Sequence, residues 1–161
     1  MTTYTKVIGG GSTVSPNAQA RKVVRRRIDC AAEAALQSLT EFSAADILEA
    51  ITVPAGYRAT AVWVDVKKVE GGAATVDIGD GATANGYLND VDINALGVTF
   101  MAPLFTDASP GVTATGFTSG KTYTSADTID ITFNTNATAV AVFDVYVEFL
   151  ALDEGAYTAY P

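Results

Sequence analysis

The sequence predicts an all-β protein: a two-sheet antiparallel β-sandwich, jelly-roll-like, with an extended N-terminal arm. Two observations lead to this prediction. Several segments alternate apolar and polar residues with a period of two, as expected for strands that bury one face only. Turn-forming glycine, proline, aspartate and asparagine separate these segments, and about eight strands at this spacing suit two packed sheets. The 161 residues are enough for one domain with its own core.

The first 20 residues differ from the rest of the chain. Gly9-Gly10-Gly11-Ser12 is flexible in composition, Pro16 stops regular structure, and no strong alternation is present. We therefore expect an extended arm over residues 1–20 and the sandwich domain over residues 21–161. The N-terminus lacks the apolar segment of a secretory signal, and no apolar run approaches the roughly 20 residues that cross a bilayer, so we expect neither export nor a membrane partner.

Two segments show the alternation most clearly. In residues 57–69, Val62, Val64 and Val66 share one face, whereas Ala61, Trp63 and Asp65 share the other. In residues 139–150, the inward face holds Phe143, Val145, Val147 and Phe149, and the outward face holds Asp144, Tyr146 and Glu148. The predicted strands are 21–32, 46–53, 57–69, 74–78, 97–105, 111–118, 127–134 and 139–150.

Some segments fit the pattern less well. Residues 31–45 suit either a short helix or alanine-rich packing in a sheet. Arg26 interrupts the inward row of the first strand, and Glu49 interrupts the strand 46–53, in which Ile47, Ile51 and Val53 are expected inward. The stretch from Gly79 to Asp92 is rich in Gly, Asp and Asn and is predicted to be a long loop.

The residue types argue against an enzyme. The chain has no histidine, which removes the commonest general base near neutral pH and the Ser-His-Asp and Cys-His arrangements. The single cysteine, Cys30, lies among apolar residues without a candidate base and is expected to be a buried structural thiol. Paired carboxylates could serve a glycosidase, but alternating strands place acids on every solvent face. We predict no catalytic residues and no cofactor.

Oxygen-bearing side chains cluster between residues 77 and 92. Asp77, Asp80, Asn85, Asn89, Asp90 and Asp92 could ligate calcium, but their spacing does not match an EF-hand. The same residue types are ordinary turn formers. We predict no metal site, although the sequence leaves a bound cation in this segment open.

The net charge of −8 conceals an asymmetry. The first 27 residues hold six basic residues and no acid, whereas the remaining 134 carry 4 basic and 18 acidic residues. A basic leader on an acidic body indicates contact with an acidic partner. Because the acidic body would repel a duplex, a protein surface fits better than nucleic acid. The alternative is a solvated charged strand without a partner.

Trp63 is out of phase with the valines of its strand, as if it faced a partner. Three interpretations stay open: the ring covers the second sheet, it anchors a subunit interface, or it stacks on a sugar together with loop tyrosines. With the charge asymmetry, this residue defines the predicted partner interface, which consists of Lys6, Arg21, Arg25, Arg27 and Trp63.

Several turn-and-strand motifs between residues 46 and 150 resemble those of jelly-roll decoration (cement) proteins of tailed-bacteriophage capsids. The residues that carry the resemblance are Ile51-Thr52-Val53-Pro54-Ala55-Gly56, the segments 74–81 and 123–132, Gly86-Tyr87-Leu88, and the closing strand Val142 to Leu150. The arm has no counterpart among these motifs.

The resemblance implies a structural virion protein that decorates and stabilises a phage capsid by bridging major capsid subunits. It also implies a homodimer or homotrimer, assembled in the host cytoplasm and seated on the outer face of the capsid. The alternative function is a carbohydrate- or receptor-binding β-sandwich module of a tail fibre, spike or collar.

Overall fold

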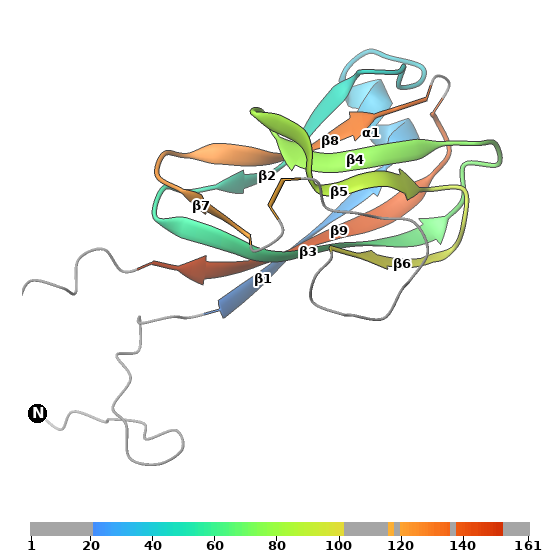
Figure 1. The fold of residues 1–161 in the computed structure, drawn as a ribbon. Helices are drawn as coiled ribbons and strands as arrows, with labels where there is room; N and C mark the ends of the chain where they lie inside the picture. The colour runs from blue at the N-terminus through green and yellow to red at the C-terminus, as the bar shows by residue number, and fades with distance from the viewer. Residues whose placement is uncertain (1–20, 102–115, 118–119, 136–137, 153–161) are drawn as a thin grey trace, which may run out of the picture.

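The computed structural model describes residues 21–101, 116–117, 120–135 and 138–152. The predicted arm, and Lys6 with it, lies outside these residues. Two antiparallel β-sheets face each other, with one short helix at one end (Figure 1). The predicted all-β sandwich is confirmed.

The first sheet has the order β1-β9-β3-β6, and β7 pairs with another stretch of β3. Its strands are β1 (Arg21–Asp29), β3 (Tyr57–Lys68), β6 (Gly97–Phe100), β7 (Lys121–Tyr123) and β9 (Val142–Ala151). The second sheet has the order β2-β8-β4-β5. Its strands are β2 (Ile47–Val53), β4 (Thr75–Asp80), β5 (Thr83–Asp92) and β8 (Asp127–Phe133).

The connections follow a nested pattern. The chain alternates between the sheets from β1 to β4, so that β1 lies beside β9 in one sheet and β2 lies beside β8 in the other. The strands β4 and β5 form a hairpin in the second sheet, and β6 returns to the first sheet beside β3. This nesting of paired strands across two sheets is the jelly-roll arrangement.

The core lies between the sheets and comes from the alternating residues. Val62, Val64, Val145 and Val147 are buried, as the sequence predicts, because β3 and β9 pair in a register that places them opposite one another. Ile129, Ile131, Phe133 and Phe143 are completely buried with them. Phe133 also stacks on Phe42, with 4.1 Å between the ring centroids.

The ambiguous segment after β1 forms a helix, α1 (Cys30–Leu36). Asp29 caps it, since its side chain accepts a hydrogen bond from the backbone N–H of Ala32 at 3.3 Å. Cys30 and Ala34 face the core, which explains the run of small residues in this segment. Among the described residues, no helix is long and apolar enough to span a membrane.

The interruptions at Arg26 and Glu49 are two parts of one interaction. The register of β2 against β8 shifts between Glu49 and Ile51, so Ala50 is an extra residue in a β-bulge. The guanidinium of Arg26 donates hydrogen bonds to the carbonyl oxygens of Glu49 and Ala50, at 3.0 and 2.7 Å, and also binds the carboxylate of Glu33. Arg26 therefore supplies hydrogen-bond donors to two backbone carbonyl groups at the bulge.

The bulge also overturns one prediction. Ile47 was expected inward with Ile51 and Val53, but it is 57% exposed. An extra residue reverses the alternation along a strand. Before the bulge Leu48 faces the core, and after it Ile51 and Val53 do.

The predicted loop from Gly79 to Asp92 is wrong, because most of it is the strand β5. Its register against β4 shifts twice, and Asp90 adopts a positive φ of 53°. These irregularities accommodate the Gly, Asn and Asp residues that suggested a loop, while Tyr87, Leu88 and Val91 are fully buried. Burial of these apolar side chains outweighs the weak strand propensity of their neighbours.

The region around residue 100 differs from the prediction in two further ways. The strand expected over 97–105 is β6, which ends at Phe100. Of the strand expected over 111–118, the structure describes only residues 116–117, which are not in a strand. The short strand β7 was not predicted, since three residues are too few to show a period.

Because Phe143 is completely buried, truncating its side chain should destabilise the protein. Phe143→Ala should lower the free energy of unfolding by about 3–5 kcal/mol, through lost transfer free energy and the cavity left behind. Urea denaturation monitored by circular dichroism measures it. Val140→Ala is the control, because Val140 is partly exposed and should change stability by less than about 0.5 kcal/mol. Equal effects from both variants would contradict the register of β9.

Candidate interaction surface

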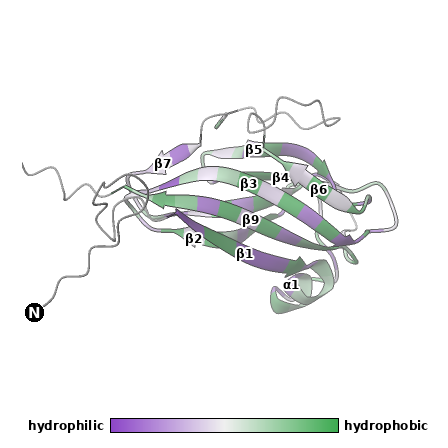
Figure 2. Ribbon diagram, turned by 90° about the horizontal axis from the view of Figure 1, so that it is seen from below, coloured by the Kyte–Doolittle hydropathy of each residue, from purple (hydrophilic) through white to green (hydrophobic). Residues whose placement is uncertain are grey.

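The outer face of the first sheet, which points away from the second sheet, gathers most of the predicted interface residues. Figure 2 looks onto this sheet, and hydrophilic and hydrophobic residues alternate along β9 and β3. Cross-strand neighbours in an antiparallel pair point to the same side. The ladder pairs Arg25 with Tyr146, Tyr146 with Trp63, and Trp63 with Phe100. These four residues, one each from β1, β9, β3 and β6, form the aromatic row.

The rings of the aromatic row stack on one another. Trp63 and Tyr146 are nearly parallel, with an interplanar angle of 5° and 5.1 Å between the centroids. Phe100 lies on the other side of the indole at 6.3 Å, and the guanidinium of Arg25 lies 6.0 Å from the centre of the Tyr146 ring. Both faces of Trp63 are therefore stacked against neighbours on the sheet.

Ion pairs flank the aromatic row. Nη2 of Arg25 lies 3.0 and 2.9 Å from the two carboxylate oxygens of Asp144, and Arg21 pairs with Glu148 at 3.0 Å. The hydrogen bond and the charge of Asp144 raise the pKa of Arg25. Lys67 pairs with Asp65, and this hydrogen bond raises the pKa of Lys67. Arg21, Arg25 and Lys67 are thus held in place by carboxylates of the same chain.

The predicted interface residues can now be placed. Arg21, Arg25, Arg27 and Trp63 alternate onto the same outer face, and Lys6 lies outside the described residues. Arg21 and Arg25 pair with carboxylates of β9 in the same chain, and their contact with an acidic partner stays a prediction. Phe100 and Val98 were missed as interface candidates. Their exposure, 47% and 45%, depends on a pairing with β3 that the sequence does not reveal.

The two sheets carry opposite charge. Strands of the first sheet hold nine basic and four acidic residues. Strands of the second sheet hold seven acidic residues and no basic residue. The basic segment that looked like a separate leader in the sequence is therefore largely the edge strand β1. The strands of the first sheet therefore carry a net positive charge and those of the second a net negative charge, although Lys121 binds Asp80 of the second sheet.

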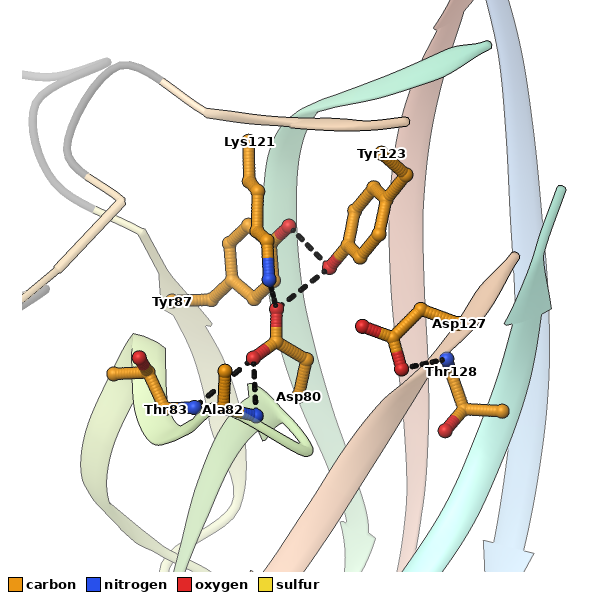
Figure 3. Close-up of polar contacts among 8 residues, drawn as sticks. All are labelled: Asp80, Ala82, Thr83, Tyr87, Lys121, Tyr123, Asp127 and Thr128. Carbon is orange, nitrogen blue, oxygen red and sulfur yellow. Dashed lines mark hydrogen bonds and ion pairs between the residues drawn. The ribbon is translucent and has the colours of Figure 1, made fainter. Parts of the chain in front are cut away.

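A second polar cluster lies at the end of the sandwich where β7 approaches the β4–β5 hairpin (Figure 3). The carboxylate of Asp80 accepts hydrogen bonds from Lys121, from the hydroxyl of Tyr123 at 3.2 Å, and from two backbone N–H groups, those of Ala82 and Thr83, both at 3.0 Å. The hydroxyl groups of Tyr123 and Tyr87 are 2.8 Å apart. This cluster joins the two sheets.

The electrostatics of this cluster do not suit acid–base catalysis at neutral pH. Burial opposes ionisation of Asp80, but the hydrogen bonds from Lys121, Ala82 and Thr83 outweigh it, so the pKa of this carboxyl is lowered. Burial raises the pKa of both Tyr87 and Tyr123 well above the ordinary value. Asp80 therefore stays ionised and both tyrosines stay protonated, as expected for a structural network.

The pKa of Asp130, in β8, is shifted in the opposite direction. This residue is almost completely buried, and one carboxylate oxygen has no hydrogen-bond partner among the described residues. Burial raises its pKa against a hydrogen bond from Thr128, and the negative charge of Glu49, directly opposite on β2, raises it further. Two like charges at directly opposed ladder positions destabilise a sheet.

The remaining candidates for chemistry have structural roles. Cys30 is a free, buried thiol, as predicted, and burial raises its pKa to about 12, which makes it a poor nucleophile. Of the possible calcium ligands, Asp77 accepts hydrogen bonds from Asn134 and from the backbone of Asp90. The described part of the chain contains no group of three or more side chains suited to hold a metal ion.

Comparisons with known proteins add a fold relationship. No protein-family model and no curated protein sequence matches the chain. A chain of the cyanophage Pam1 capsid asymmetric unit matches with a TM-score of 0.60 at 14% identity, over 92% of this chain and 96% of that one. A chain of the Ralstonia phage GP4 capsid matches with a TM-score of 0.56 at 15% identity, over 85% and 88%.

A third match comes from the acid-stable capsid of Helicobacter pylori bacteriophage KHP30. Its TM-score is 0.51 at 14% identity, over 81% of this chain and 86% of that one. At these identities the likeness shows a shared fold. The jelly-roll sandwich described above is thus a fold found among chains of phage capsids.

The Asp80 network predicts a stability loss that depends on pH. Because the folded-state pKa of Asp80 is lowered, its ionised form stabilises the protein above the unfolded-state pKa of about 3.9, and this contribution is lost as the pH falls through the folded-state value. Asp80→Asn should therefore lower the free energy of unfolding by about 2 kcal/mol at pH 7. Urea denaturation at pH 7 and pH 3 should show a smaller difference at pH 3. A difference that does not change with pH would contradict the network.

For Asp130 we predict a pH-dependent change in stability of the opposite sign. Because its folded-state pKa is raised, the protonated form contributes stability that is complete below about pH 3.9 and is lost as the pH rises through the folded-state pKa. Asp130→Asn should thus increase the free energy of unfolding by about 1 kcal/mol at pH 7 and give no gain at pH 3. The same urea titrations measure this change, and Asp80→Asn is the matched control variant. Destabilisation at pH 7 would show that the charge of Asp130 is compensated.

Proposed function

We propose that this chain is a non-enzymatic structural protein of a tailed-phage virion. In this role it decorates the outer face of the capsid as a homodimer or homotrimer and bridges neighbouring major capsid subunits. A protein that binds the assembled shell, and not free subunits, stabilises the shell by mass action. The proposal assigns the chain no catalytic activity and no cofactor.

The observation that carries this proposal is the match in size as well as in fold. The three phage-capsid chains are covered over 86–96% of their own length, and this chain over 81–92% of its length. The likeness therefore extends over whole chains of similar length, and not only over one domain of a larger neighbour. A small compact sandwich with one aromatic, charged face suits a subunit that attaches to a larger assembly.

The geometry of the aromatic row argues against the alternative function. A carbohydrate-binding sandwich needs an aromatic face that a sugar ring can cover. Here Tyr146 and Phe100 cover the two faces of Trp63. No second candidate function is therefore supported by a specific contact in the described residues.

The proposal predicts a location and a phenotype. Virions of the phage that encodes the chain should contain it in many copies, and antibody labelling in electron micrographs should mark the head surface. An early stop codon in its gene should leave heads that assemble but release DNA at a lower temperature. Adding the purified wild-type protein should restore the release temperature of these heads.

The control for this experiment is Phe143→Ala, whose core cavity should weaken the fold and thus the rescue. Absence of the protein from purified virions, or labelling confined to the tail, would contradict the proposal.

A further inference from the structure

The strongest unexplained feature of the molecule is the outer face of the first sheet. Val23, Val98 and Phe100 are 51%, 45% and 47% exposed there, beside the partly exposed Trp63 and Tyr146. Tryptophan, tyrosine, phenylalanine and arginine are the residue types enriched in protein interfaces and in their energetic hot spots. We propose that this face docks on an acidic protein surface with an apolar centre. Under the proposed function, on which this inference rests, that surface belongs to the capsid shell, and the acidic second sheet points away from it.

The exposure of the charges supports an acidic partner. The side chains of Arg21, Arg25 and Lys67 are 69%, 50% and 43% exposed, whereas the carboxylates that hold them, Glu148, Asp144 and Asp65, are 23%, 1% and 20% exposed. Each carboxylate lies beneath its cation. An approaching surface therefore meets guanidinium and ammonium groups whose positions are already fixed, which lowers the entropic cost of binding.

Arg27 adds a further positive charge to this face. It is exposed, and it has no ion-pair partner in the described part of the chain. The second sheet, whose strands carry acidic residues and no basic ones, would be repelled by the same partner. The distribution of charge thus sets the orientation of the molecule on its partner.

Two other occupants fit less well. Nucleic acid needs uncompensated cations along a phosphate backbone and open ring faces for base stacking. On this face most cations are paired, and the faces of Trp63 are covered. For charge complementarity, a second copy would have to place its acidic second sheet on this face. The two sheets lie on opposite sides of the sandwich, so such contacts would add copies in a row without closing a ring.

The test uses heads that lack the protein, as described above, and measures the bound amount of purified variants by co-sedimentation in low salt and in high salt. Arg27→Glu should lower the affinity about fivefold, and Phe100→Ser about tenfold. The matched control is Lys22→Glu, which makes the same charge reversal on β1 but on the side of the strand that faces the core. Glu49→Lys is the control on the acidic sheet. Both controls should bind like the wild type, and thermal melts should show that all variants are folded.

The outcomes separate this inference from the proposed function. If the wild type does not bind the heads, the proposed function fails. If the wild type binds and Arg27→Glu and Phe100→Ser bind equally well, the function stands and this face is not the docking surface. Stronger loss from Lys22→Glu or Glu49→Lys would also overturn the inference.

Three measurements identify other occupants of the face. Trp63 is the single tryptophan of the chain, so its fluorescence reports on this face alone. Acrylamide should quench it in the free protein, and protection there would show that another segment of the chain covers the face. Sedimentation velocity in low salt should show no growing polymers. Polymers that Arg27→Glu abolishes would identify a second copy as the occupant, and equal binding of duplex DNA and heads would identify nucleic acid.

Discussion

The structure depends on the antiparallel pairing of β3 with β9 at the centre of the first sheet. One register places Val62 and Val64 opposite Val147 and Val145 on the core side, and Trp63 opposite Tyr146 on the outer side. Both the buried core and the exposed aromatic row therefore follow from the same ladder. A slip of one residue would exchange the two faces, burying aromatic and charged side chains and exposing valines. The hydrophobic gain from burying these valines holds the register, and the register positions the candidate surface.

The strongest irregularities of the fold are compensated locally. Ala50 bulges out of β2, and the guanidinium of Arg26 donates hydrogen bonds to two carbonyl groups at the bulge. Glu70 has a similar role between β3 and β4, because its carboxylate accepts hydrogen bonds from the backbone N–H groups of Ala139, Val140 and Ala141 just before β9. Charged side chains that break a hydrophobic pattern can thus satisfy backbone groups that the ladder leaves unpaired.

The division of charge between the sheets connects the fold with the proposed role. A sandwich exposes two faces, and here one presents aromatic rings and cations paired with less exposed carboxylates, while the strands of the other carry acidic residues and no basic ones. Under the docking inferred above, an acidic partner would meet the first sheet and would be repelled by the second. The carboxylates that pair with Arg21 and Arg25 lower the net positive charge of this face. A lower net charge limits non-specific binding to polyanions.

The sequence by itself determined the fold class and the inward faces of the regular strands, because a period of two is a local property that survives without knowledge of the partner strand. It also marked Trp63 and the arginines of β1 as unusual. Only the tertiary structure decided that these residues share one face with Tyr146 and Phe100, that Glu148 and Asp144 hold the arginines, and that β5 is a strand despite its turn-forming residues. Those outcomes depend on pairings and bulges between segments far apart in the chain, and burial against those distant segments overrides local propensity.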